Sequence, residues 1–366
     1  MEFDGFDLGS EVKRAVENAL RELRTVNVLI AGRTGVGKST LINAMFAGNL
    51  AETGQGRPVT ISTREYWKEG IPLRIFDTRG LETAAYAETL GELRKFVSER
   101  ASDTSADRHV HVAWVCVAED SRRVERAEVE THEMLARHMP VVGVVTKSRA
   151  DQGFRAVVQD LLPLARNVVR VRAVREELDD GHVIEQFGLE NLVETTLQVV
   201  PESHRRAFVA AQRASLEHKK RHAHGIVATS AFAAAGFAAT PLPFADAAAL
   251  VPIQIGMLAG ISATWGLEIS TAFLTTLVAA ASGATAATFV GRALVGGLLK
   301  MLPGAGSVVG GAISAATAST ITAALGETYI LTLSTLFSAK DGQIPTGEEV
   351  KGEFKKRLAE RFQRRA

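Results

Sequence analysis

The chain has 366 residues, which is room for about two domains, and its 46% hydrophobic and 23% charged content excludes a chain that is disordered as a whole. A net charge of +1 gives no reason to expect nucleic acid, DNA in particular, as a partner. The single cysteine, Cys116, excludes an internal disulfide framework and fits a reducing compartment, and residues 1–10 lack the apolar core of a secretory signal. We therefore expect a folded cytoplasmic protein.

Charges are dense up to about His224 and sparse from Ile226 to Ala339, where Ala, Gly, Thr and Ser dominate. This break predicts the main domain boundary. The expected parts are an N-terminal amphipathic helix (1–24), an α/β domain (25–200), a connecting helix (201–224), a hydrophobic all-α domain (225–340) and a basic amphipathic tail (341–366).

The first strong motif lies between an apolar run, Val26–Ala31, and a segment from Thr40 onward that is typical of a helix. Strand, glycine-rich loop, Gly-Lys-Ser and helix are the context that a phosphate-binding P-loop requires. Glycines let the backbone aim its N–H groups at phosphate oxygens, and the helix N-terminus adds donors. Lys38 is expected to bridge the β- and γ-phosphates, and Ser39 to hold Mg²⁺. The predicted phosphate-binding residues are Gly32, Arg33, Thr34, Gly35, Val36, Gly37, Lys38, Ser39 and Thr40.

Two further motifs follow at the positions that nucleotide switches use. The loop around Thr60 is expected to supply a threonine to Mg²⁺ and the γ-phosphate, with Thr63 as the alternative. Residues 73–80 then form an alternating strand that ends in Asp-Thr-Arg-Gly. Asp77 is expected to hold the metal through a water, and the N–H of Gly80 to bond the γ-phosphate. The predicted metal ligands are thus Ser39, Thr60 and Asp77.

The rest of this region alternates strands and helices. Strands are predicted over 110–117, 141–145 and 168–174, and helices over 125–137 and around 160–164. Such alternation implies a mostly parallel sheet with helices on both faces, the three-layer α/β sandwich of P-loop NTPases. Ligands of such sheets bind at the carboxyl ends of the strands, where all of these motifs fall.

In their order and spacing these residues resemble the Era-like branch of the small P-loop GTPases, and the stretch from Thr60 to Glu82 also looks like the immunity-related GTPases. The resemblance covers about residues 25–200. It implies that the chain binds GTP and GDP with Mg²⁺ and hydrolyses GTP to GDP and phosphate, with Lys38 and Thr60 as catalytic residues. Leu81 stands where Ras-type enzymes carry the glutamine that orients water, so we expect a low intrinsic rate.

The base-reading motif departs from the family pattern Asn/Thr-Lys-x-Asp. Thr146 and Lys147 fit, but position 149 is an arginine, and the nearest acid, Asp151, lies two residues late. A rearrangement of one turn would still bring Asp151 to the base. Guanine specificity therefore rests mainly on the resemblance, and a general nucleoside triphosphatase stays open. The family's last motif has only a faint echo in Arg172-Ala173.

The C-terminal half contains four largely uncharged stretches, 226–245, 247–267, 269–291 and 301–326, each long enough to cross a bilayer as a helix. Prolines around Asp246 favour a broken or re-entrant hairpin over clean spans. Residues 243–257 resemble the hydrophobic domain of unknown function 697, which is commonly predicted to associate with membranes. Against spanning, Ala, Gly, Ser and Thr contribute little to insertion, so a soluble helical domain is the alternative.

Two functions are consistent with these features. The first is a GTP-dependent switch that controls the hydrophobic domain in membrane association or self-assembly. Its G domain would lie in the cytoplasm at the inner face of a membrane, with the bilayer and further copies of the chain as partners. The second is a soluble Era-like GTPase that assists ribosome or RNA assembly. The hydrophobic half favours the first, since the sequence has no recognisable RNA module.

Overall fold

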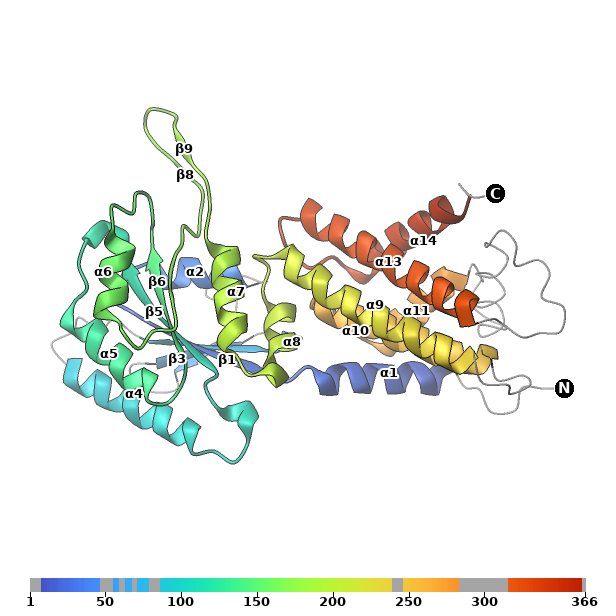
Figure 1. The fold of residues 1–366 in the computed structure, drawn as a ribbon, viewed down its shortest axis with the longest axis horizontal. Helices are drawn as coiled ribbons and strands as arrows, with labels where there is room; N and C mark the ends of the chain where they lie inside the picture. The colour runs from blue at the N-terminus through green and yellow to red at the C-terminus, as the bar shows by residue number, and fades with distance from the viewer. Residues whose placement is uncertain are drawn as a thin grey trace. The chain divides into compact units, whose positions relative to one another are not determined.

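The computed structural model describes residues 8–46, 55–58, 63–67, 71–78, 86–238, 246–282 and 315–363. The chain divides into two compact units. Figure 1 shows the chain coloured from blue at the N-terminus to red at the C-terminus. One unit is Arg24–Ser215, and the other combines Met1–Leu23 with Leu216–Ala366. The chain therefore passes from one unit to the other twice.

The Arg24–Ser215 unit is built on a seven-stranded sheet in the order β2-β3-β4-β1-β5-β6-β7. The strands are β1 (Val26–Ala31), β2 (Gln55–Pro58), β3 (Thr63–Trp67), β4 (Leu73–Thr78), β5 (Val112–Ala118), β6 (Val141–Thr146) and β7 (Val168–Arg170). The five strands from β4 to β7 pair in parallel, whereas β2 and β3 add an antiparallel edge. Every residue of β1, β5 and β6 is buried, as expected for parallel strands covered on both faces.

Helices cover both faces of this sheet and complete the predicted three-layer α/β sandwich. They are α2 (Lys38–Met45), α4 (Tyr86–Ala101), α5 (Arg126–Ala136), α6 (Phe154–Leu161), α7 (Leu189–Val199) and α8 (Glu202–Ala211). Along β1, Val28 and Ile30 join a core with α2, α7 and α8, while Leu29 packs on the other face with α4, α5 and α6. This alternation follows from the two-residue period of a strand.

Several predicted element limits differ from the structure. The strand predicted over 168–174 ends at Arg170, and the helix expected around 160–164 is α6, which ends at Leu161. The predicted single helix over 201–224 is wrong, because α8 ends at Ala211 and α9 (Leu216–Ala238) begins after a break. In that break the buried side chain of Gln212 accepts a bond from the Ser215 N–H (2.7 Å) and donates to the Ser215 carbonyl (2.9 Å).

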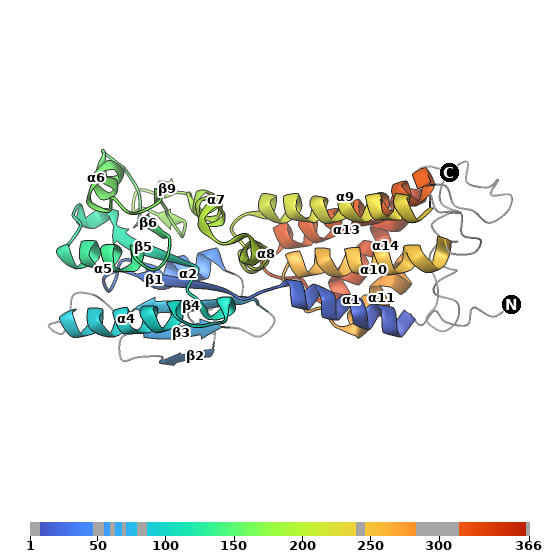
Figure 2. The same cartoon turned by 60° about the horizontal axis from the view of Figure 1, so that its bottom comes forward.

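The second unit is helical and has one apolar core. It contains α1 (Leu8–Glu22), α9, α10 (Asp246–Thr264), α11 (Thr271–Ser282), α13 (Ala315–Ala339) and α14 (Gly347–Gln363). The apolar side of α1, with Val12 and Ala19 buried, packs against α10 and α11, as Figure 2 shows. The helix at the start of the chain is therefore part of the C-terminal helical unit.

Among the helices of the described ranges, none combines the length and the apolar character needed to span a bilayer. The described parts of the four predicted stretches lie mainly in α9, α10, α11 and α13, and their residues 239–245, 283–291 and 301–314 fall outside the described residues. Helix α10 runs through Pro252 without ending there, so the predicted break is not at that proline. Pro241 and Pro243, the other prolines of the predicted break, lie outside the described residues.

Candidate functional site

The P-loop connects β1 to α2 at the carboxyl end of the sheet. Gly32 has φ +150°, and a Cβ added there would lie 2.6 Å from the carbonyl oxygen of Cys116, so only glycine fits against the neighbouring strand. Gly37 has φ +95° and forms the N-cap of α2. The loop therefore turns the chain from a buried strand directly into a helix N-terminus.

Lys38 lies across this loop and is 8% exposed. Its Nζ donates to the carbonyl oxygens of Gly32 (2.8 Å) and Arg33 (3.1 Å). Thr34, Gly35, Ser39 and Thr40 are exposed around it, whereas Val36 is buried. An ammonium group held over exposed backbone N–H groups at a helix N-terminus is an arrangement that binds phosphate.

Two neighbouring side chains hold the loop in place. Thr146, at the end of β6, donates from its buried Oγ1 to the carbonyl oxygens of Val36 (2.5 Å) and Val117 (3.3 Å). The guanidinium of Arg33 lies 3.3 Å from Oε1 of Glu125, which caps the N-terminus of α5. The side chains of Thr146 and Arg33 thus position the loop, a role that the sequence motifs did not indicate.

Asp77 is the last residue but one of β4, where it pairs in register with Ile30 of β1. Its Oδ1 is buried and has no hydrogen-bond partner among the described residues. Burial raises the pKa of Asp77 to about 6, against the attraction of Lys38 and Arg64. A buried carboxylate oxygen without a described protein donor requires a ligand or a proton.

The predicted switch residues have different outcomes. Thr63 begins β3, is 2% exposed and pairs with Thr78, so it lies in a strand and not in the loop where it was expected. Thr60 and Gly80 lie outside the described residues.

The residues present fit Mg²⁺. Asp77 offers a carboxylate oxygen without a partner among the described residues, and Ser39 has an exposed side chain at the start of α2. In the described ranges no three His, Cys, Asp or Glu side chains form a metal cluster. Mg²⁺ needs no such cluster, because it binds through one or two protein oxygens together with phosphates.

A pocket of about 640 Å³ extends from the start of α2 to the loop after β6. It is lined by Gly37, Thr40, Leu41, Glu119, Asp120, Arg122, Thr146, Lys147, Arg149, Ala150, Val171, Arg172, Ala173, Val174, Arg175 and Glu176. Lys147 has φ +51°, and its Nζ lies 3.2 Å from Oδ2 of Asp120. The pocket is therefore continuous with the P-loop and contains the residues of the base-reading motif.

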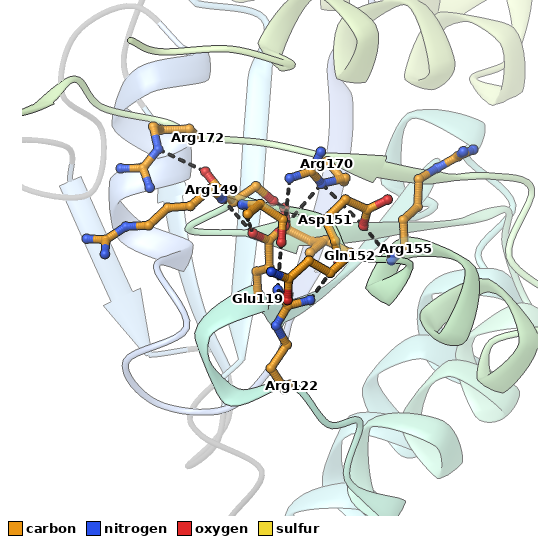
Figure 3. Close-up of polar contacts among 11 residues, drawn as sticks. Glu119, Arg122, Arg149, Asp151, Gln152, Arg155, Arg170 and Arg172 are labelled. Carbon is orange, nitrogen blue, oxygen red and sulfur yellow. Dashed lines mark hydrogen bonds and ion pairs between the residues drawn. The ribbon is translucent and has the colours of Figure 1, made fainter. Parts of the chain in front are cut away.

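Glu119 holds the loop after β6 and is buried (Figure 3). Its Oε1 accepts from the backbone N–H groups of Arg149 (2.5 Å) and Ala150 (2.8 Å), and Oε2 accepts from Nε and Nη2 of Arg170 (both 3.0 Å). Burial raises the pKa of Glu119, but these donors outweigh it and hold the pKa below its usual range. No sequence motif pointed to this residue, which directly follows the buried strand β5.

Asp151 does not lie where a base-reading carboxylate is needed. Its Oδ1 accepts from the backbone N–H of Arg155 in the first turn of α6 (2.8 Å) and lies 3.5 Å from Nε of Arg170. Figure 3 shows this side chain directed toward Arg155 and Arg170, and it does not line the pocket. The geometry contradicts the prediction that Asp151 reads the base, because its Oδ1 is bonded to the first turn of α6 and its side chain lies outside the pocket.

Residues 27–147 match a family model described as 50S ribosome-binding GTPase. The chain carries a GTPase domain. Residues 203–360 match the model of the Domain of unknown function (DUF697), which overlaps the helical unit. The narrower resemblance of the GTPase domain to the Era-like and immunity-related branches stays a prediction.

Curated relatives share part of the chain. The tRNA modification GTPase MnmE of Paracidovorax citrulli (strain AAC00-1) is 31% identical over 189 residues, which are 48% of this chain and 36% of that protein. The protein of the same name from Polaromonas naphthalenivorans (strain CJ2) is 39% identical over 100 residues, 26% of this chain and 19% of that protein. The chain thus spans little more than a third of the length of the first relative.

Solved structures also align with the chain. The cytosolic domain of the T. maritima FeoB iron transporter in a GDP form aligns over 91% of this chain and 98% of that chain, with 15% identity and a TM-score of 0.32. The elongation factor SelB of Methanococcus maripaludis aligns over 49% of this chain and 35% of that chain, with 19% identity and a TM-score of 0.29. At these scores neither likeness supports a functional conclusion.

Proposed function

We propose that the chain binds GTP with Mg²⁺ and hydrolyses it slowly to GDP and phosphate. The observation that carries this proposal is the combination of a P-loop lysine with a buried Oδ1 of Asp77, on the adjacent strand, that has no partner among the described residues. In this proposal Lys38 exchanges its carbonyl partners for the β- and γ-phosphates. Ser39, Asp77 and Thr60 hold Mg²⁺, which when bound neutralises the charge that develops on the phosphates.

The nucleotide state is proposed to act on the helical unit through the segment that leaves the GTPase unit. The N–H of Arg213 donates to the carbonyl of Met45 (2.8 Å), and its Nε donates to the carbonyl of Ala44 (3.3 Å). Phe46 forms a bridge with Gln212. The last turn of the P-loop helix is thus bonded to residues that directly precede α9, which supports a switch that changes how the helical unit associates with a membrane or with further copies.

The activity is tested by phosphate release from GTP in Mg²⁺, comparing the wild type, Lys38→Ala and Lys13→Ala. Lys13 is exposed on α1 and serves as the matched control. We expect slow release by the wild type and Lys13→Ala and none by Lys38→Ala. Equal release by all three proteins would show that the P-loop is not the active site.

The switch is tested on two samples, the GDP-bound protein and the protein bound to a non-hydrolysable GTP analogue. Each is subjected to limited proteolysis and to partitioning onto anionic vesicles. We expect different cleavage within residues 216–366 and a different vesicle-bound fraction. Identical cleavage and partitioning in the two states would contradict the switch and leave GTP hydrolysis unaffected.

A second candidate is a GTPase that acts on ribosomes or RNA. The description of the matching family model and the names of the curated relatives support it. Co-sedimentation with ribosomal particles that depends on GTP would favour this function over the membrane switch. If the protein did not co-sediment in the presence of either GTP or GDP, this second function would be excluded.

A further inference from the structure

We propose that Glu176 is the carboxylate that reads the base of the bound nucleotide. This inference rests on the proposed function, because it concerns the same nucleotide pocket. Glu176 lies in β8 (Glu176–Glu177), which forms a small hairpin with β9 (Val183–Ile184). The residue lies 27 positions beyond Arg149 and lines the pocket together with Lys147 and Arg149.

The pocket needs an acceptor that the base-reading motif itself does not provide. The Watson–Crick edge of guanine carries two neighbouring donors, N1–H and the 2-amino group. A carboxylate accepts from both donors at once, whereas a guanidinium has only donors. Arg149 therefore cannot take the place of the aspartate that the family pattern has at this position.

The other carboxylates that line the pocket do not meet this need. Each oxygen of Glu119 already accepts two bonds, so its acceptor sites, about four in number, are filled by the protein. The side chain of Asp120 is 59% exposed and pairs with Lys147. An exposed carboxylate with a single flexible partner is poorly fixed for reading a base edge.

Glu176 is fixed by two arginines from two different parts of the chain. Oε1 accepts from the guanidinium of Arg149, and Oε2 accepts from the guanidinium of Arg172. Arg172 is only 4% exposed, and its Nε donates to the carbonyl of Ser148 (2.9 Å). The backbone of Arg172 also exchanges two hydrogen bonds with Phe187, which closes the base of the hairpin.

The remaining acceptor capacity of Glu176 matches guanine. Each of its oxygens has one bond from an arginine, which leaves about one acceptor site on each oxygen. Two free sites on one carboxylate fit the two donors of guanine. The hydrogen bonds from Arg172 and Arg149 also lower the pKa of Glu176, so the side chain is ionised at neutral pH. Arg149 then positions the carboxylate of Glu176. The arginine at the place of the family's aspartate is therefore compatible with guanine binding.

The test is competition for a fluorescent GDP analogue on the full chain in Mg²⁺, with GDP, IDP, XDP and ADP as competitors. IDP lacks the 2-amino group, and XDP has an oxygen in its place. We expect GDP to bind the wild type about tenfold or more tightly than IDP, because one bond to Glu176 is lost. In Glu176→Gln, one carboxylate oxygen becomes an NH₂ donor. The affinity for GDP should therefore fall about tenfold or more, while XDP, with an oxygen in place of the 2-amino group, should bind more tightly than to the wild type.

Two variants serve as controls. Glu177→Gln changes the exposed neighbour in the same strand, which does not line the pocket, and should keep the wild-type preference. Asp120→Asn tests the alternative carboxylate and should leave the order of the nucleotides unchanged.

The outcomes separate this inference from the proposed function. An unchanged ratio of GDP to XDP affinity in Glu176→Gln, or an inversion in Asp120→Asn instead, would overturn the role of Glu176 while leaving GTP binding intact. Equal affinity of the wild type for GDP and IDP would also overturn it without any variant. No binding of any nucleotide by the wild type would refute the proposed function itself.

Discussion

At the scale of single residues, the nucleotide site depends on buried polar side chains that organise loops. Glu119 has four donors from three residues, and Thr146 connects β6 with the P-loop. Neither side chain has to touch the nucleotide to matter. When such a side chain is removed, the loop is no longer fixed before the nucleotide binds. Ordering the loop then costs part of the binding free energy.

The first prediction concerns Glu119. Glu119→Ala leaves Arg170 and two backbone N–H groups without their acceptor, so the free energy of unfolding should fall by about 3–5 kcal/mol. Urea denaturation of the full chain, followed by the fluorescence of buried Trp114, measures this change. Glu177→Ala at an exposed site should change stability by about 0.5 kcal/mol or less. Equal effects of the two variants would contradict the role assigned to Glu119.

The second prediction concerns Thr146. Thr146→Val keeps the shape but removes the hydroxyl that donates to the carbonyl of Val36, so nucleotide affinity should fall about five- to tenfold. Thr146→Ser retains the hydroxyl and should bind nearly as well as the wild type. Titration with a fluorescent GDP analogue measures both variants. If Thr146→Ser lost as much affinity as Thr146→Val, the methyl contact and not the hydrogen bond would be responsible.

Residues that act through local sequence were predictable, and those that act through distant contacts were not. The strand Val26–Ala31, the P-loop and Asp77 follow one another along the sequence, and in the structure the P-loop and Asp77 lie at the carboxyl ends of the adjacent strands β1 and β4. Arg149 and Glu176 are 27 positions apart and meet only because a hairpin follows β7. No periodicity or motif in the sequence connects those two residues.

At the scale of elements, the helical unit includes a close approach between two of its helices, beside a core that contains large side chains such as Trp265 and Phe354. Helix α13 packs along α9, and Gly326 lies at their contact. A Cβ added at Gly326 would be 2.5 Å from Cγ2 of Val227 and 2.9 Å from Sδ of Met257. The glycine therefore sets the distance between α13 and its neighbours.

The third prediction follows from this contact. Gly326→Ala should lower the free energy of unfolding of the helical unit by about 1–3 kcal/mol, because Val227 and Met257 must move. Gly225→Ala is the matched control, since a Cβ there meets nothing within 4 Å, and it should stabilise α9 by about 0.5–1 kcal/mol. Thermal denaturation followed by circular dichroism compares the variants. A stabilising effect of Gly326→Ala would show that α9 and α13 pack less closely.

The predicted elements differ from the structure where contacts outside the element decide. The strands at the centre of the sheet were found because each is a mostly apolar run. The break between α8 and α9 was missed, since it depends on the buried side chain of Gln212 and on one backbone and one side-chain bond from Arg213 to the P-loop helix. The same applies to α1, whose amphipathic pattern was evident but whose partners, α10 and α11, lie more than 200 residues away.

At the scale of the whole molecule, the helical unit contains a fully buried lysine. Nζ of Lys219 donates to the carbonyl of Thr264 at the end of α10 (3.0 Å) and lies 5.5 Å from the ring centre of Phe337. Burial lowers the pKa of Lys219 from its ordinary value of 10.5 to about 7. Its protonation is therefore coupled to the stability of this unit.

The fourth prediction is a pH dependence. Between about pH 7 and pH 9.5 the unfolded chain still binds the proton of Lys219 that the folded chain has released, so the free energy of unfolding should rise with pH. The slope is at most about 1.4 kcal/mol per pH unit. Lys219→Met should lack this component. The measurement is the difference in stability between wild type and variant at several pH values, and a difference that does not vary with pH would contradict it.

The central claim is that this chain binds guanine nucleotides through its P-loop, and one equilibrium measurement tests it most directly. A fluorescent GDP analogue is titrated onto the wild type and onto Lys38→Ala in Mg²⁺, and is then displaced by GTP or by ATP. The account predicts that GTP displaces the analogue at far lower concentrations than ATP does, and that Lys38→Ala does not bind. Equal displacement by ATP, or binding that survives in Lys38→Ala, would contradict it.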